Sequence, residues 1–216
     1  MNDRLQMQDV IVNTHKHMDS VMISEQKIKE RVFELAKESL SKFNSHECIF
    51  LPCFTGAMFF ATDFLRAREQ ISWIEREEKV VLELNGSLDD VGSCFSTSYA
   101  HGTVCAEDDS VSVHLKGECK GKKAVIIEDI VDTGGTLVRL AKALYAEGCT
   151  EVHVVSLLNK QARRKAEHEE KLRTLIKTLT IGFEIEVEFV VGYGLDFNGL
   201  YRCLPYIGVL HPELYK

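Results

Sequence analysis

The sequence lacks the features that would direct it to a membrane, to secretion or to a zinc site. None of its apolar stretches is long enough to span a bilayer, and the N-terminal segment lacks the apolar core of a signal peptide. Its seven cysteines form no C-x-x-C pair, and its eight histidines form no H-E-x-x-H pattern. We therefore expect a cytoplasmic protein with reduced, mostly buried thiols and without zinc chemistry.

An excess of positive charge is also missing. The formal net charge is −7, so no general electrostatic attraction to nucleic acid or to an anionic membrane is expected. The hydrophobic fraction of 45% and the charged fraction of 27% are ordinary for a globular chain, and 216 residues suffice for one domain with a sizeable core. We expect a single domain over residues 1–216, with residues 1–20 loosely held.

Strand and helix signals alternate along the chain. Apolar runs predict strands at 48–54, 79–84, 123–129, 151–158 and 188–191. Helical periodicity predicts helices from the Ser24 cap to Phe43, over 57–68 and over 135–147, with Gly148 as a left-handed cap. The polar stretch 85–110 predicts a long loop with some strand at its edges. This order indicates an α/β fold with a mostly parallel twisted sheet flanked by helices.

The stretch AVIIEDIVDTGGTL, residues 124–137, joins a predicted strand to a predicted helix. Such a turn offers free backbone N–H groups and the positive end of a helix dipole. Gly134 and Gly135 let a ligand approach the backbone, and Thr133 and Thr136 add hydroxyl donors. The turn therefore predicts a phosphate site, although it has neither the Walker spacing nor the G-x-G-x-x-G fingerprint.

Two carboxylates before this turn narrow the range of ligands that it could bind. Glu128 and Asp129 would repel a bare phosphate, but they suit a phosphate with a neighbouring diol or a divalent cation. We therefore predict a ribose phosphate with Mg²⁺, and Asp132 is free to act as a base or to balance positive charge. An isolated D-T-G would be explained equally well by a capped helix start, with Asp132 or Thr133 as the cap; the flanking acids and Thr136 favour the binding site.

Four separated motifs resemble a known family. IIEDIVDTGGTL is similar to the signature of the phosphoribosyltransferases that use 5-phosphoribosyl-1-pyrophosphate (PRPP). FVVGYGLDFNGLYRCLPYIGVLHPELY, residues 189–215, resembles the end of hypoxanthine-guanine phosphoribosyltransferases, especially the bacterial form. SLLNK (156–160) resembles their purine segment, FTGAMFFATDFL (54–65) their first phosphate loop, and Thr97-Ser98-Tyr99 the start of their mobile loop. The resemblance runs from about residue 24 to the end.

The resemblance implies the type I phosphoribosyltransferase fold with a small hood formed by the termini, and roles for individual residues. Asp132 is expected beside purine N7 as the catalytic residue. Glu128 and Asp129 would face the ribose hydroxyls and Mg²⁺, and Asp196 would serve a second Mg²⁺ site and the edge of the base. The residues expected on the 5′-phosphate are Thr133, Gly134, Gly135 and Thr136.

The remaining implied roles concern pyrophosphate and purine. Thr55, Gly56 and Arg202 would bind pyrophosphate, the Thr55–Gly56 peptide would be cis, and Ser98 and Tyr99 would close over the reacting centre. Purine contacts are expected from Lys160 to O6, from Phe189 by stacking and from the Val190 backbone. The expected partners are PRPP and a 6-oxopurine, without nucleic acid or membrane, in a dimer or tetramer.

The sequence departs from the family pattern at Thr55, in residues 161–180 and in the loop 86–109, and two alternative functions accompany the resemblance. Thr55 stands where some relatives carry lysine, and residues 161–180 are longer and more charged than expected. We predict a helical, solvated surface insertion there, with a subunit contact as the alternative and Leu172, Leu175, Ile176 and Leu179 as its apolar face. A xanthine-preferring enzyme and a non-catalytic RNA-binding regulator on the same fold are the other functions considered.

Overall fold

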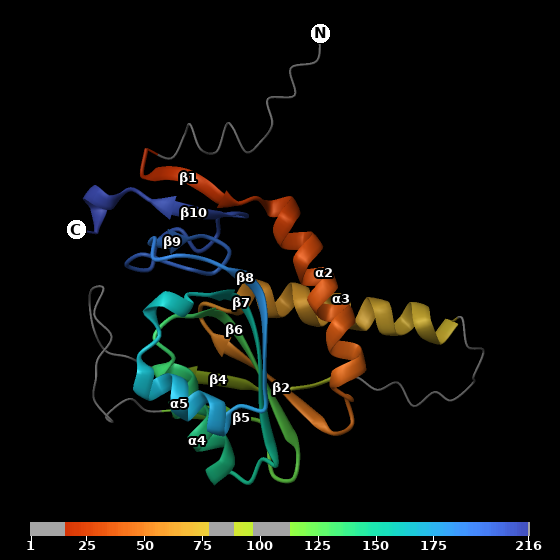
Figure 1. The fold of residues 1–216 in the computed structure, drawn as a ribbon. Helices are drawn as coiled ribbons and strands as arrows, with labels where there is room; N and C mark the ends of the chain where they lie inside the picture. Colours follow the sequence, from red (N-terminus) through yellow and green to blue (C-terminus); the bar gives the residue numbers. More distant parts are fainter. Residues whose placement is uncertain (1–15, 78–88, 97–112, 216) are drawn as a thin grey trace.

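The structure is a computed structural model, and it describes residues 16–77, 89–96 and 113–215. Figure 1 shows a central sheet with helices packed against it and a second, smaller sheet above. The helices are α2 (Glu25–Lys42), α3 (Met58–Glu77), α4 (Gly135–Ala146) and α5 (Ala166–Leu175), with short 3₁₀ turns η1 (Gln161–Arg163) and η2 (Pro212–Leu214). In α2 the Ser24 hydroxyl accepts a hydrogen bond from the Lys27 N–H, which confirms the predicted cap.

Seven strands form the central sheet within the described residues. The strands are β2 (Cys48–Phe54), β3 (Asp90–Val91), β4 (Ser93–Ser96), β5 (Val113–Lys116), β6 (Lys123–Val131), β7 (Glu151–Asn159) and β8 (Thr178–Glu184). Their order is β5-β4-β2-β6-β7-β8, with β3 also paired to β2. Every pairing is parallel except that of β4 with β5. The predicted mostly parallel α/β sheet is therefore confirmed.

Both faces of this sheet are covered, which explains why its central strands are apolar without alternation. Along β6, Val125 and Ile127 pack with α2 and α3, whereas Ala124 and Ile126 pack with α4 and α5. All four side chains are fully buried. The resulting rigid layer fixes where β6 ends and where α4 begins.

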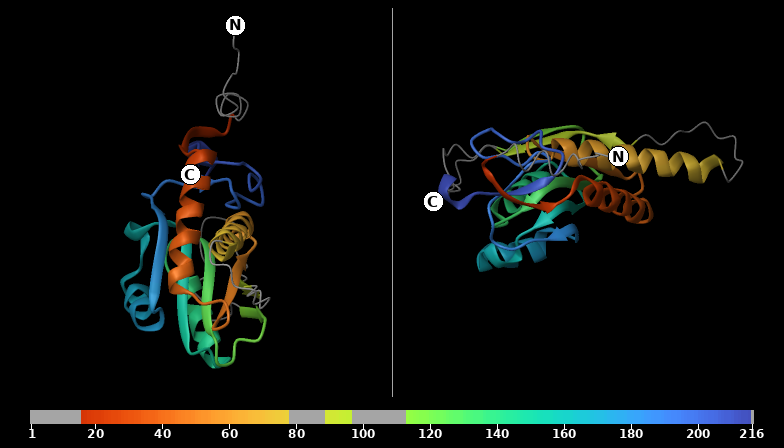
Figure 2. Two further views of the ribbon diagram at one scale, coloured as in Figure 1. Left: turned by 90° about the vertical axis from the view of Figure 1, so that its right-hand side faces the viewer. Right: turned by 90° about the horizontal axis from the view of Figure 1, so that it is seen from above.

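The chain ends form the hood, a three-stranded sheet of order β1-β10-β9, where β1 is Met18–Ile23, β9 is Val190–Val191 and β10 is Ile207–Leu210. Its strands are antiparallel. The hood lies above one end of the central sheet, as Figures 1 and 2 show from three sides. This arrangement confirms the hood that the family resemblance implied.

The structure corrects two of the expected elements. Within residues 161–180 only 166–175 is an α-helix, because the chain enters β8 at Thr178 and pairs with β7. The predicted strand 188–191 is shorter and belongs to the hood rather than to the central sheet. The strand predicted at 79–84 lies outside the described residues.

The α5 segment is exposed along much of its length, but its apolar face is packed against the core. Leu172 and Ile176 are buried in the core that α4 shares, and Leu175 packs against it, whereas Leu179 is exposed. The hydroxyl of Tyr145 on α4 donates a hydrogen bond to the Leu175 carbonyl over 2.9 Å. The apolar face of this segment thus belongs to the core because it meets α4.

None of the helices in the described ranges is long and apolar enough to cross a membrane.

Candidate active site

The turn from β6 to α4 forms one wall of a pocket of about 220 Å³. Gly134 stands at the N-cap of α4 with φ +86°, a left-handed conformation that glycine adopts at little cost. No side chain caps this helix, so neither Asp132 nor Thr133 satisfies its first N–H groups. The N-terminus of α4 therefore leaves backbone N–H groups without a side-chain cap at this pocket.

The pocket brings together most of the predicted ribose-phosphate residues. The predicted site residues that line this pocket are Gly56, Glu128, Asp129, Asp132, Thr133, Gly134 and Thr136. They come from the carboxyl ends of the neighbouring strands β2 and β6, where ligands bind in open parallel sheets. One pocket thus holds carboxylates and a free helix terminus side by side.

Glu128 and Asp129 form a crowded acidic pair at the pocket. Burial first, then the Cys53 thiol and the Asp129 carboxyl, raise the pKa of Glu128 well above its usual range. Burial also raises the pKa of Asp129, although Glu128, the Ile130 N–H and the Arg202 charge oppose that rise. The Ile130 N–H donates to Asp129 Oδ1 over 2.7 Å. Little positive charge lies close to the two carboxyl groups, so their negative charge is poorly balanced.

This shortage fits a divalent cation. Mg²⁺ is commonly held by one or two carboxylates together with substrate phosphates rather than by an all-protein cage. Within the described residues no three His, Cys, Asp or Glu side chains form a group that could hold a metal, so Asp196 does not join Glu128 and Asp129 in one. The acidic pair therefore suits a cation that arrives with an oxygen-rich ligand.

Asp132 lies at the mouth of the turn and meets a residue that the sequence did not point to. Its Oδ1 lies 2.9 Å from Nε of Arg163, in the 3₁₀ turn that follows β7. Both side chains are partly exposed, but Oδ1 itself is buried, and its contact with Arg163 does not have the geometry of a hydrogen bond. Asp132 can therefore exchange Arg163 for another donor at little cost.

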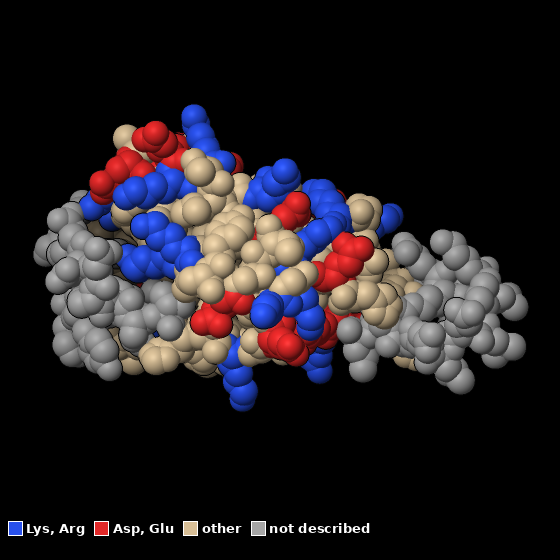
Figure 3. Space-filling view, turned by 90° about the horizontal axis from the view of Figure 1, so that it is seen from below, with Lys and Arg blue, Asp and Glu red and all other residues tan. Residues whose placement is uncertain are grey.

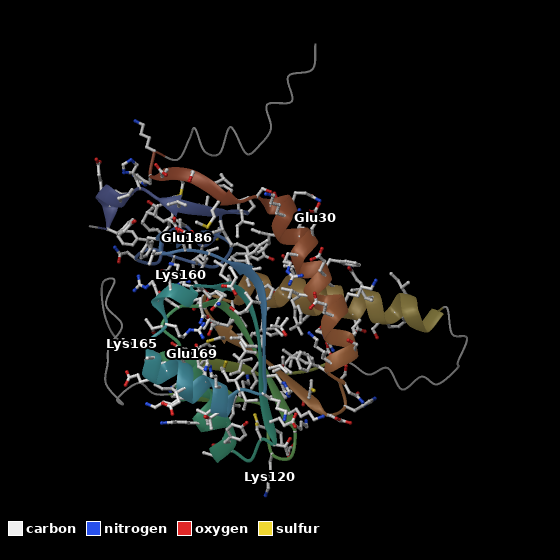
Figure 4. The ribbon with its side chains drawn as sticks, viewed as in Figure 1. Glu30, Lys120, Lys160, Lys165, Glu169 and Glu186 are labelled. Atoms are coloured by element: carbon white, nitrogen blue, oxygen red, sulfur yellow. The ribbon has the colours of Figure 1, made fainter. Side chains whose placement is uncertain are left out.

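Lys160 directly follows β7 and is buried rather than solvated. It is 5% exposed, and its Nζ donates a hydrogen bond to the Glu188 carbonyl over 2.7 Å. Burial lowers its pKa, while the nearby charges of Asp132 and Glu188 oppose that change. Figure 4 shows Lys160 between the upper end of the central sheet and the hood. This position suits a donor to a polar ligand atom close to Asp132.

Phe189 and Val190 lie in the hood above Lys160. The Phe189 ring stacks on Tyr215, with centroids 5.0 Å apart, and meets Phe197 edge-on. Val190 is buried and pairs with Val209 of β10. The Phe189 carbonyl is engaged by the Leu210 N–H over 2.8 Å. The hood thus presents a half-buried aromatic ring that its neighbours hold in place.

Two glycines lie in a chain of close contacts at the acidic pair. Gly56 of the first loop lies against Asp129, and Gly194 of the C-terminal loop lies against Gly56. A methyl group on Gly56 would overlap the Asp129 carboxylate, and one on Gly194 would overlap the Gly56 carbonyl. Gly194 also has φ +105°, so both space and backbone conformation demand glycine there. The C-terminal loop is therefore in contact with the first loop, and the first loop with Asp129 of the acidic pair.

Arg202 and Asp196 are paired within this loop. Arg202 Nη2 lies 2.7 Å from Asp196 Oδ1, and its Nη1 donates to the Gly194 carbonyl over 2.6 Å. Asp196 also accepts the Gly199 N–H over 2.7 Å. The Arg202 charge reaches Asp129, as the effect on the pKa of that carboxyl indicates. Arg202 thus places a positive charge near the pocket.

A cis peptide lies in the first loop, one residue earlier than expected. The Phe54–Thr55 bond is cis, rather than the bond between Thr55 and Gly56. Ser98 and Tyr99 fall outside the described residues, so their predicted roles stay predictions.

Sequence reasoning missed three residues around the site. Cys53 lines the pocket, Arg163 pairs with Asp132, and His168 contacts the Thr133 carbonyl. Arg163 and His168 belong to the segment taken for a solvated insertion. The i, i+4 pair Leu172 and Ile176 was the available signal, since an apolar face needs a partner surface.

Comparison with known proteins defines the class. The sequence profile described as the phosphoribosyl transferase domain matches residues 22–198, more than half of the chain, and the protein belongs to this family. The hypoxanthine phosphoribosyltransferase from Staphylococcus aureus superposes with a TM-score of 0.75 at 28% identity, covering 98% of this chain and all of that one.

Proteins of similar sequence include a named hypoxanthine-guanine phosphoribosyltransferase. The hypoxanthine-guanine phosphoribosyltransferase of Bacillus subtilis (strain 168) is 32% identical over 202 residues, which are 93% of this chain and 98% of that protein. The bifunctional protein TilS/HprT of Listeria monocytogenes is 33% identical over 94% of this chain, but the chain spans only 27% of its length.

Proposed function

We propose that this protein transfers the 5-phosphoribosyl group of PRPP to N9 of hypoxanthine or guanine, giving IMP or GMP and pyrophosphate in purine salvage. The observation that carries the proposal is the single pocket that joins the acidic pair Glu128–Asp129, the acid Asp132 and the free N-terminus of α4. The names of its relatives in Bacillus subtilis and Staphylococcus aureus support it.

The proposed binding of PRPP follows from the pocket walls. The 5′-phosphate accepts hydrogen bonds from the N–H groups of residues 133–136, where the helix dipole favours negative charge. The ribose hydroxyls donate to Glu128 and Asp129. Thr55, Gly56 and Arg202 lie toward the pyrophosphate, with Ser98 and Tyr99 proposed to close over it. Bound Mg²⁺ would neutralise charge on the leaving pyrophosphate, and Glu128 and Asp129 are the residues proposed to hold it, with Asp196 at a second site.

The proposed reaction needs no covalent intermediate on the protein. The bond from C1′ to the pyrophosphate oxygen breaks with its electron pair leaving on oxygen, and purine N9 forms a bond to C1′. Positive charge develops on the ribose, and the carboxylates of Glu128 and Asp129 stabilise it. Asp132 exchanges Arg163 for the purine and accepts the proton from N7.

The proposed purine site lies between Lys160 and the hood. The Lys160 ammonium donates to the exocyclic O6, Phe189 stacks on the base, and the Val190 backbone contacts its edge. The burial of Lys160 supports this role, because a buried donor discriminates strongly against a base that leaves it unpaired. The same contacts accept either hypoxanthine or guanine.

An RNA-binding regulator on this fold would require a basic face. On the face opposite the hood, Figure 3 shows lysine and arginine side chains interspersed with aspartate and glutamate. The described part of this face therefore offers no continuous positive surface to a phosphate backbone.

Three further proposals accompany the function. The chain 1–216 acts as one phosphoribosyltransferase domain, works in the cytoplasm and assembles as a dimer or tetramer. The six cysteines within the described residues are free thiols, which suits a reducing compartment. Sedimentation of the purified protein measures the assembly.

A spectrophotometric assay with PRPP and Mg²⁺ tests the function, with hypoxanthine, guanine, xanthine and adenine offered separately. We expect turnover of hypoxanthine and guanine that a chelator abolishes. Faster turnover of xanthine would replace the proposed substrate preference. An absence of turnover with every 6-oxopurine would overturn the proposed function and give weight to RNA binding.

A further inference from the structure

Helix α5 packs directly against the proposed phosphate turn. A methyl group on Gly134 would lie 2.8 Å from Leu172 Cδ1, 3.0 Å from Arg164 Cδ and 3.3 Å from His168 Cβ. Leu172 itself is 4% exposed and belongs to the core cluster that contains α4. Figure 1 shows α5 beside α4, and Figure 4 shows Glu169 on it. One face of α5 thus forms the outer support of the turn.

His168 makes the polar contact between this helix and the turn. Its Nδ1 lies 2.9 Å from the Thr133 carbonyl oxygen, and its side chain is 19% exposed. A carbonyl oxygen can only accept, so Nδ1 carries the hydrogen and donates. The contact joins residues 35 positions apart in the chain, so it depends on the packing of α5.

The orientation of one peptide follows from this hydrogen bond. The Thr133 carbonyl shares a peptide plane with the Gly134 N–H, and in a trans peptide these two groups point in opposite directions. His168 holds the carbonyl on the α5 side. The pocket lies on the other side, since Thr133 and Gly134 line it and no residue of α5 does. The Gly134 N–H is thereby aimed toward the pocket.

The turn needs such a restraint because of its composition. Gly134 and Gly135 are adjacent, and glycine loses more conformational freedom on ordering than any other residue. A turn that is fixed before its ligand arrives loses less entropy on binding.

We propose that His168 is a positioning residue, which holds the Thr133–Gly134 peptide with its N–H toward the 5′-phosphate of the substrate. The inference rests on the proposed function for the identity of that substrate. His168 acts through the backbone and does not touch the reacting atoms. Helix α5 is accordingly part of the phosphate site, although the pocket contains none of its side chains.

Two substitutions separate the hydrogen bond from the packing. His168→Asn can keep an N–H donor near the position of Nδ1, whereas His168→Leu keeps volume and removes the donor. Lys171→Ala is the matched control, because Lys171 is exposed on the same helix. Each variant is assayed for KM with PRPP, KM with hypoxanthine and kcat, and its binding of ribose 5-phosphate is measured by calorimetry.

We expect His168→Leu to raise KM for PRPP and Kd for ribose 5-phosphate about five- to thirtyfold, the effect of losing one partly buried hydrogen bond. KM for hypoxanthine should change less than twofold, and His168→Asn should recover most of the loss. Equal affinity for ribose 5-phosphate in His168→Leu and wild type would overturn the inference. So would equal losses for PRPP and hypoxanthine, which indicate general disruption. If the wild type were inactive, the proposed function would fall, while the ribose 5-phosphate measurement would still decide the role of His168.

Discussion

Arg163 Nε lies 2.9 Å from Asp132 Oδ1, although the two residues are 31 positions apart in the chain. The pair links the loop after β6 to the loop after β7 at the carboxyl edge of the sheet. Both side chains are partly exposed, so the pair contributes at most about 1 kcal/mol. Asp132 can therefore change partner when a purine arrives.

Asp132→Asn should lower kcat for hypoxanthine about 10²- to 10³-fold, because an amide cannot accept the N7 proton. Arg163→Gln is the matched variant, since it removes the other partner of the same pair. It should change kcat/KM less than about fivefold, as the pair is screened. Steady-state kinetics of both variants decide the matter. Equal losses in the two would show that the ion pair, and not the carboxylate, is what catalysis needs.

Lys160 should give purine binding an alkaline limit. Burial lowers its pKa, so the folded protein loses this proton at a lower pH than the unfolded chain, whose lysine titrates near 10.4. KM for hypoxanthine should rise as pH increases through the lowered pKa, because the neutral amine is a weaker donor to O6. In that same window the stability of the wild type should increase, since the unfolded chain binds the extra proton.

Lys160→Arg is the control for this pH profile. Its guanidinium stays protonated, so the rise in KM that the lysine causes should disappear. Ionisation of the purine itself affects both proteins equally, and the ratio of the two KM values removes it. A ratio that is independent of pH would contradict the role given to Lys160.

Gly194→Ala should reduce activity at least tenfold and lower stability by about 2 kcal/mol or more. Its new methyl group would overlap the Gly56 carbonyl, and Gly56 in turn contacts Asp129. Gly121→Ala is matched for backbone strain, with φ +77° and no atom within 4 Å of the added methyl. It should cost stability but leave KM for PRPP unchanged. Thermal melts and PRPP titrations distinguish the two effects, and equal behaviour of both variants would refute the close contact.

Glu128→Gln should make the metal-free protein more stable while it lowers activity. Glu128 is 6% exposed beside a second carboxyl, so a neutral side chain of similar shape relieves burial and repulsion. We expect a gain of about 1 kcal/mol, or about 2–4 °C in Tm. Asp89→Asn is the contrasting control, because Asp89 pairs with buried Arg68 at 2.9 Å and its loss should destabilise. A lower Tm for Glu128→Gln without metal would count against the crowded pair.

The central strands and the phosphate turn were predictable because their signals are local. The apolar run of β6, the acids at its end and the D-T-G-G turn lie within 14 residues, and each supports the same strand–turn–helix unit. The extent of β8 was not predictable in this way. Leu172, Leu175, Ile176 and Leu179 repeat with helical spacing, yet the chain turns extended at Thr178 because β7 offers a partner.

The contacts missed in the site are long-range. Arg163 meets Asp132, and His168 meets the Thr133 carbonyl, only after β6 and β7 have paired and α5 has docked on α4. In the sequence both residues sit in a highly charged stretch, which is more often a solvated face. In the fold this segment packs against α4 instead, because the apolar side chain of Leu172 is buried there.

The most direct test of the central claim is the stoichiometry of products. Purified protein is incubated with PRPP, Mg²⁺ and hypoxanthine, and chromatography quantifies IMP, pyrophosphate and ribose 5-phosphate over time. The account predicts one IMP for each pyrophosphate released, with no release when hypoxanthine is omitted. Pyrophosphate released without IMP, or no consumption of PRPP at all, would contradict phosphoribosyl transfer to a 6-oxopurine.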